Sequence, residues 1–197
     1  MAGTNTTKLK ITKTAWRLFH EKGYNETTVD DIVAESGTSK GSFYHYYSCK
    51  DELLSSLSDL CDSKYEDVVK NMDPNMDSFD KLLFLCYAVH DMFEQEIPIG
   101  LIASLYSSQV VTKGDRHLQH KDRFYYKIIR QIIQEGQARG EIADDISCDD
   151  AQRLYTLAER AIIYDYCICD GSYSLGEYTR EAMPRLICSL RKSPEAN

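Results

Sequence analysis

The sequence has few residues that interrupt helices and no long apolar run. Only 10 of its 197 residues are glycine and four are proline. No apolar run reaches the ~18 residues that a membrane-spanning helix needs. The opening residues, MAGTNTTKLK, contain no apolar segment of the kind that a secretory signal requires. We therefore expect a cytoplasmic protein with no membrane partner.

Cysteine is present, but not in the patterns that indicate crosslinks or metal. The seven cysteines are an odd number, scattered through apolar stretches, whereas a disulfide framework favours an even number in a small secreted chain. A CxxC pair is missing, which excludes the usual zinc knuckle. His117 and His120 have HxxH spacing, but without a neighbouring Cys or Glu they indicate a solvated loop. We expect no metal site and no cofactor.

Positive charge is scarce overall but unevenly distributed. The net charge is −8, yet residues 1–50 hold seven Lys or Arg against five Asp or Glu. The remaining residues hold 16 against 26. This asymmetry is expected if only the N-terminal part meets phosphate, although an excess of two charges is also compatible with chance.

Helical periodicity dominates the chain, with helix-stopping Gly and capping Thr or Ser between the segments. We predict an all-α protein of about nine helices, with Pro184 kinking the last. An N-terminal three-helix domain, residues 1–50, precedes a larger C-terminal helical domain, residues 51–197. The predicted helices cover residues 9–22, 29–36, 39–47, 50–70, a stripe over 79–93, 99–110, 123–140, 149–171 and 174–192.

The segment GTSKGSFYHYYSCKDELL, residues 37–54, has the spacing of a helix-turn-helix, with Gly37 at the corner between two short helices. Phe43 and Tyr47 are four residues apart and form the side that docks on the other helices. The opposite side carries hydroxyls, lysine and aromatic rings, which a helix lying in the major groove can use. Lys40 is long enough to reach a base edge.

Residues 11–54 closely resemble the DNA-binding domain of TetR-family transcriptional regulators. The resemblance is carried by Ala15, Phe19, Gly23, Tyr24, Thr27, Thr28, Ile32, Ala34, Gly37, Ser39, Gly41, Tyr44, Tyr46, Lys50 and Leu53. It implies a homodimer that binds a roughly palindromic double-stranded DNA operator. It also implies a repressor that a small-molecule effector, bound in the C-terminal domain, releases from that operator.

The resemblance assigns the DNA contacts to named positions. It implies phosphate contacts from Thr28, Thr38, Ser39, Tyr44, His45, Tyr46 and Lys50, with Lys40, Gly41 and Ser42 facing bases. The chain departs from the family at Tyr47, usually Phe, whose hydroxyl needs a partner. It also departs at Ser48, often lysine, and at Cys49, where a better helix cap usually stands.

The C-terminal helices carry the expected effector pocket and dimer interface. Candidate pocket residues are Phe84, Tyr87, His90, Phe93, Tyr106, Phe124, Tyr125, Tyr155 and Tyr164, although the alternative is that most of them are core. The last two helices are expected to form a four-helix interface between protomers. Its candidate residues are Ala158, Ala161, Ile162, Ile168, Tyr178, Leu186 and Leu190.

Two other classes of function stay open at this stage. One is an all-α enzyme, against which the chain offers no nucleophile–base pair, metal set or phosphate loop, so we do not expect an enzyme. The other is a DNA-binding dimer controlled by a partner protein instead of a small molecule. The sequence does not decide between repressor and activator.

Overall fold

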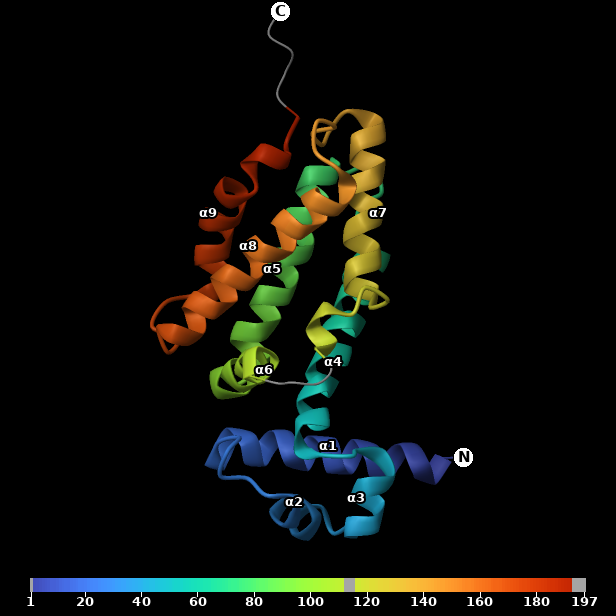
Figure 1. The fold of residues 1–197 in the computed structure, drawn as a ribbon, viewed down its shortest axis with the longest axis vertical. Coiled ribbons are helices and arrows are strands. Elements are labelled where there is room, and N and C mark those ends of the chain that lie inside the picture. The colour runs from blue at the N-terminus through green and yellow to red at the C-terminus, as the bar shows by residue number, and fades with distance from the viewer. Residues whose placement is uncertain (1, 112–115, 193–197) are drawn as a thin grey trace, which may run out of the picture. The chain divides into compact units, whose positions relative to one another are not determined.

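The computed structural model describes residues 2–111 and 116–192. Over these residues the chain forms nine α-helices and two short 3-10 helices, without a β-strand, which confirms the all-α prediction (Figure 1). The helices are α1 (Ala2–Lys22), α2 (Val29–Ser36), α3 (Lys40–Tyr46), α4 (Lys50–Lys70), α5 (Ser78–Glu96), α6 (Ile99–Val111), η1 (His117–Gln119), α7 (Phe124–Arg139), α8 (Cys148–Ile168), α9 (Leu175–Leu186) and η2 (Cys188–Leu190). No helix in the described part of the chain is both long and apolar enough to cross a membrane.

The chain divides into two compact units, each described by itself below. Unit 1 comprises Met1–Leu60 and Ile97–Leu118, and unit 2 comprises Cys61–Glu96 and Gln119–Asn197. Helix α4 is continuous across the division at residue 60. The predicted boundary at residue 50 is a functional one, drawn between the expected DNA-binding and ligand-binding residues. The division into compact units does not test it, so it stays a prediction.

Unit 1 is built around α1. This helix contacts α2, α3 and α6, and α2 and α3 contact each other, so the two short helices share one side of α1 (Figure 1). Burial of apolar side chains accounts for the arrangement, since each fully buried one stabilises the fold by about 1.5–3 kcal/mol. The buried set includes Ile11, Leu18, Ile32, Phe43, Leu53 and Leu57.

Unit 2 contains four main helices. Helix α5 packs against α7 and α9, and helix α8 packs against the same two helices. The apolar stripe predicted over residues 79–93 forms the inner face of α5. Its neighbours contribute Ile129 and Ile133 from α7 and Ile162 from α8.

The C-terminal helix is shorter than predicted. Pro184 lies in the last turn of α9, which ends at Leu186, and the chain continues as the separate 3-10 helix η2. Proline lacks the N–H that would continue the helical ladder and clashes with the preceding turn. It therefore ends this helix instead of kinking a longer one.

Candidate DNA-binding surface and buried polar cluster

Helix α2 begins at a complete capping box. The Thr28 hydroxyl accepts a hydrogen bond from the Asp31 N–H (3.1 Å), and the Asp31 carboxylate accepts one from the Thr28 N–H (2.9 Å). These bonds from Thr28 lower the pKa of Asp31 to about 2. The Thr28 hydroxyl also donates a hydrogen bond to this carboxylate. In this structure, the Thr28 side chain therefore serves to cap the start of α2.

The turn between α2 and α3 depends on Gly37 and Ser39. Gly37 adopts φ 60° and ψ 34°, a left-handed conformation that glycine reaches without steric cost, and it caps α2. The Ser39 hydroxyl then accepts from the Ser42 N–H (3.0 Å) and caps α3. The predicted helix-turn-helix is therefore present, and of the two candidate caps Thr38 and Ser39, the structure uses Ser39.

One side of α3 anchors it to unit 1. Phe43 is fully buried and Tyr47 nearly so, and their ring centroids lie 5.9 Å apart. The Tyr47 hydroxyl, at which this chain departs from the family it resembles, is hydrogen-bonded to the Thr12 hydroxyl of α1. The extra polar atom is thus satisfied inside the unit, and α3 is held rigidly against α1.

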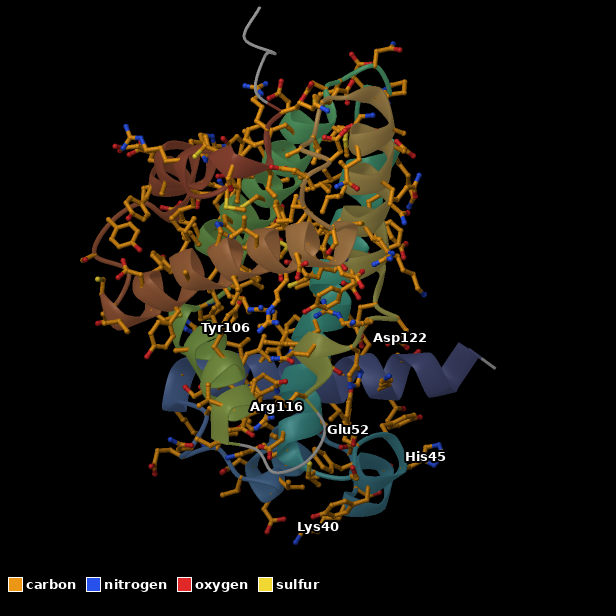
Figure 2. All side chains as sticks on the ribbon, turned by 45° about the horizontal axis from the view of Figure 1, so that its top comes forward. Lys40, His45, Glu52, Tyr106, Arg116 and Asp122 are labelled. Atoms are coloured by element: carbon orange, nitrogen blue, oxygen red, sulfur yellow. The ribbon has the colours of Figure 1, made fainter. Side chains whose placement is uncertain are left out.

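The other side of α3 faces solvent. Lys40, Gly41, Tyr44 and His45 are exposed, Tyr44 to 56%, and the side chains of Lys40 and His45 project outward in Figure 2. Lys40 forms a surface ion pair with Asp30 (2.7 Å). Four of the predicted DNA-contact residues thus share one accessible side of α3.

Gly41 leaves space on this exposed side. A Cβ built at Gly41 would meet only the Ser39 hydroxyl within 4 Å, at 3.7 Å, which is an ordinary contact. Glycine costs about 1 kcal/mol relative to alanine inside a helix. The protein's own packing therefore does not require glycine here.

Lys50 is the predicted phosphate contact with the most constrained side chain. Its ammonium group donates to the carbonyls of Tyr24 (2.7 Å) and Thr27 (2.9 Å). It also lies 4.2 Å from the centre of the Tyr24 ring. Partial burial lowers the pKa of Lys50. In this structure Lys50 ties the start of α4 to the loop before α2, so phosphate contact by its side chain stays a prediction.

The start of α4 compensates for the poor cap at Cys49. The Glu52 carboxylate accepts hydrogen bonds from the N–H and the hydroxyl (2.7 Å) of Ser48. This satisfies a backbone donor just before the helix. The departure of this chain at Ser48 and Cys49 from the family it resembles is thus accommodated locally.

The predicted pocket residues occupy different environments. His90, Phe93, Tyr125 and Tyr155 are buried in unit 2, whereas Phe84 and Tyr164 are exposed on α5 and α8. Tyr87 and Phe124 of unit 2 are of intermediate exposure, as is Tyr106, which belongs to unit 1. The structure does not bring Phe84 and Tyr164 into the interior of unit 2, because they lie on the outer sides of their helices.

The buried tyrosines converge on a carboxylate that the sequence analysis missed. Glu159 is buried in α8 and accepts hydrogen bonds from Tyr65 (3.0 Å) and Tyr125. Burial raises the pKa of Glu159, although these hydroxyl groups oppose the rise. The sequence carries a signal for the burial of Glu159. Its position lies on the same helical face as three apolar or aromatic residues, Tyr155, Ile162 and Tyr166.

His90 is fully buried beside this carboxylate. Its Nδ1 lies 2.7 Å from the Thr179 hydroxyl, and its ring nitrogens lie 3.8 and 3.9 Å from the Cys86 sulfur. Burial lowers the pKa of His90 to about 3. His90 is therefore a neutral, hydrogen-bonded core histidine, which agrees with the alternative that pocket candidates belong to the core.

The predicted interface residues divide between core and surface. Ala158, Ile162 and Leu190 are buried within unit 2, so their side chains pack inside this unit. Ala161, Ile168, Tyr178 and Leu186 are exposed. On α8 the exposed apolar stripe consists of Leu157, Ala161, Tyr164 and Ile168.

The structure describes only part of the HxxH pair. The side chain of His117 lies outside the described residues, and His120 is of intermediate exposure after η1. Cys167 is of intermediate exposure and Cys169 is exposed. Among the described residues, the one group of three potential metal ligands lies elsewhere, at Cys86, His90 and Glu159.

Comparison with known proteins gives the same family as the helix-turn-helix. Residues 11–57 match the model for bacterial regulatory proteins of the tetR family. The chain is 32% identical over 111 residues to the HTH-type transcriptional regulator YxaF of Bacillus subtilis, covering 53% of this chain and 58% of that protein. It is 31% identical over 113 residues to IcaR of Staphylococcus epidermidis, the negative regulator of the biofilm operon icaADBC, covering 57% and 61%. These alignments span less than two thirds of either relative.

The whole fold also has a counterpart among solved structures. The structure of the transcriptional regulator FadR from Bacillus subtilis, in complex with stearoyl-CoA, aligns with a TM-score of 0.75 at 18% identity. It covers 93% of this chain and all of that one, which extends the likeness in fold beyond the helix-turn-helix. Residues 11–57, which include the capped α2–α3 pair, therefore match the DNA-binding domain of the tetR family, and the chain is similar to TetR-family transcriptional regulators.

Proposed function

We propose that the protein is a homodimeric repressor that binds a roughly palindromic operator through α3 and is released by a small molecule bound in unit 2. The observation that carries the DNA-binding part is the outward side of α3. It combines Lys40, the open space at Gly41 and the rings of Tyr44 and His45 on a helix that Phe43 locks in place. Lysine can reach base edges, and hydroxyl or imidazole groups can hold phosphates.

The exposed apolar stripe on α8 supports the dimer. Leu157, Ala161, Tyr164 and Ile168 recur at intervals of three or four residues on the side of α8 opposite its buried residues. Tyr178 and Leu186 of α9 are also exposed. Apolar surface of this kind marks an interaction site, and a two-fold dimer would match the symmetry of a palindrome.

We propose that the protein represses transcription instead of activating it, because IcaR, with which the chain shares 31% identity, is a negative regulator. Control by a small molecule is suggested by the fold shared with FadR in complex with stearoyl-CoA. Helix α4 is the route for such control, since it begins beside the helix-turn-helix and ends in unit 2.

The proposed mechanism changes the separation of the two reading helices. Two α3 helices must lie about one turn of B-DNA apart, ~34–36 Å, to enter successive major grooves. A ligand that shifts the second half of α4 would move α3 from this spacing. A coupling of about 1–3 kcal/mol would weaken operator binding roughly 5- to 150-fold.

The test is to select genomic fragments with the purified protein and to footprint the fragments that it retains. The proposal expects one protected site with two symmetric halves whose centres are about one helical turn, or a multiple of it, apart. A screen of small molecules should then find one that releases the protein from this site. Protection of a single half-site by one protomer would contradict the dimer, and release only by another protein would favour partner control.

A further inference from the structure

Unit 2 contains three potential metal ligands that meet in its interior. Cys86 and His90 are four residues apart on α5 and therefore share one face of that helix. Glu159 approaches them from α8. All three side chains are buried, and their ligand atoms lie within 4.8 Å of one another.

The hydrogen bonds of His90 leave one ring nitrogen available. The Thr179 hydroxyl donates its only hydrogen to the Leu175 carbonyl (2.7 Å), so it accepts at its 2.7 Å contact with His90 Nδ1. Nδ1 must then carry the ring proton, and Nε2 keeps its lone pair. A histidine that binds metal through one nitrogen typically donates the other N–H to such a neighbour, which fixes the tautomer.

The Glu159 carboxylate is oriented in the same way. Tyr65 donates to one of its oxygens (3.0 Å) and Tyr125 donates to the other. A carboxylate offers about four acceptor sites, so both oxygens keep lone pairs after these bonds. Hydrogen bonds to a ligating carboxylate are a usual part of the surroundings of a bound metal.

The donor set selects the class of metal. Thiolate and imidazole together favour Zn²⁺ and its neighbours over Mg²⁺ and Ca²⁺, which prefer oxygen. Bond lengths of about 2.3 Å to sulfur and about 2.0 Å to nitrogen place the two ligands roughly 3.6 Å apart in a tetrahedral site. The Cys86 sulfur lies 3.8 Å from His90 Nε2, which is close to this separation. It also lies 3.9 Å from Nδ1, so the Cys86 side chain must turn toward the Nε2 lone pair to share an ion with it.

We propose that unit 2 binds one zinc-class divalent ion through the Cys86 sulfur, His90 Nε2 and a Glu159 carboxylate oxygen. Binding releases the thiol proton of Cys86, and any proton on Glu159, to solvent. The thiolate and carboxylate then balance the two charges of the ion, which satisfies the requirement that buried charges be paired. Three protein ligands leave a fourth position for water or another small donor. This site goes beyond DNA binding and does not depend on it.

Cobalt(II) is the direct probe, because it takes zinc sites and its thiolate complexes absorb light. Metal-free protein titrated with Co²⁺ should develop a thiolate-to-cobalt band that saturates at one ion per chain. Cys86→Ser should lose this band. A variant in which the exposed Cys49, Cys169 and Cys188 are all changed to serine should keep it. A band that persists in Cys86→Ser, or a titration without saturable binding in the folded protein, would show that the cluster is only a hydrogen-bonded core.

A second pair of variants separates ligand positioning from folding. Thr179→Val removes the acceptor that fixes His90, so Zn²⁺ affinity measured against a competing chelator should fall about 10- to 100-fold. Thr156→Val is the matched control, because Thr156 is equally buried but its hydroxyl donates to the carbonyl of Arg153 on its own helix. Circular dichroism confirms that each variant is folded. Equal affinities for the two variants would overturn the proposed role of His90.

Discussion

Gly41 is the residue at which the stability of α3 and the binding of DNA can be separated. The space around it accepts a Cβ without a clash, so Gly41→Ala should leave the melting temperature unchanged or raise it. In the complex the same Cβ would crowd the duplex. We expect operator affinity, measured by fluorescence anisotropy, to fall about tenfold or more. Unchanged affinity would show that α3 does not approach DNA closely at this position.

Lys40 tests base recognition. Its ammonium pairs with Asp30 on the surface, 62% of its side chain is exposed, and it is free to exchange this partner for a base edge. Lys40→Ala should lower the preference for operator over scrambled duplex by about fivefold, since one base contact is worth about 1 kcal/mol at the low end.

Lys70→Ala is the matched control for Lys40→Ala. Lys70 forms a similarly exposed ion pair with Asp67, but it lies at the end of α4 in unit 2. Binding measured on both duplexes should be unaffected by this change. If the two lysine variants behave alike, Lys40 does not read bases.

His90 should make stability depend on pH. Burial depresses the pKa of the folded state to about 3, so between about pH 6.5 and pH 3 the unfolded chain binds a proton that the folded chain does not. The stabilisation is complete above pH 6.5 and is lost as pH falls through this window, by at most about 1.4 kcal/mol per pH unit. His90→Gln should flatten the fall in free energy of unfolding between pH 7 and pH 5.

Glu159, whose pKa burial raises, contributes with the opposite sign, because its share of the stability is lost as pH rises above its ordinary range. Because Glu159 lies beside His90, the same comparison in a Glu159→Gln background separates the contribution of His90. His20→Gln, at an exposed position of α1, is the matched control. Parallel pH profiles for wild type and His90→Gln would show that His90 does not titrate on unfolding.

At the scale of elements, local sequence signals predicted the helix-turn-helix closely. The capping box at Thr28, the left-handed Gly37 and the Ser39 cap act within a few residues, so α2 and α3 were predicted to within one residue. Helix α4 was predicted from Lys50 to Lys70, as observed. Such signals are readable because capping is decided by the residues at the helix end itself.

Elements whose environment depends on distant segments were predicted less well. Which side of α8 is buried is decided by α7 and α9, and the predicted interface set mixed the buried Ala158 and Ile162 with the exposed Ala161 and Ile168. The cluster of Cys86, His90 and Glu159 joins residues about 70 positions apart. No local spacing rule could have found it.

The apolar stripe on α8 gives a prediction at this scale. Ile168 is 65% exposed, and a charge there should disrupt a dimer without unfolding the protomer. We expect Ile168→Asp to sediment as a monomer and to lose most operator binding. Val110→Asp changes an equally exposed apolar residue on α6 of unit 1 and should stay dimeric. A dimeric Ile168→Asp variant would place the interface elsewhere.

In the whole molecule, we assign DNA reading to one compact unit and dimerisation with ligand binding to the other, and α4 joins the two. Unit 1 carries the reading helix, and unit 2 carries the apolar stripe and the buried polar cluster. The charge is uneven along the sequence, with an excess of two positive charges over residues 1–50 within a chain of net charge −8. An acidic protein can therefore present a DNA-binding surface at one end of its sequence.

The central claim is that α3 reads a specific DNA sequence as part of a dimer. It is tested most directly by fluorescence anisotropy on the duplex immediately upstream of the protein's own gene, over a salt series, with a scrambled duplex of equal length as control. The account predicts tight binding of two protomers to the upstream duplex, at least about 10³-fold tighter than to the scrambled one. Affinity for both duplexes should fall steeply as salt rises, because phosphate contacts release counterions. Equal, weak binding to the two duplexes would contradict recognition of this upstream DNA by α3.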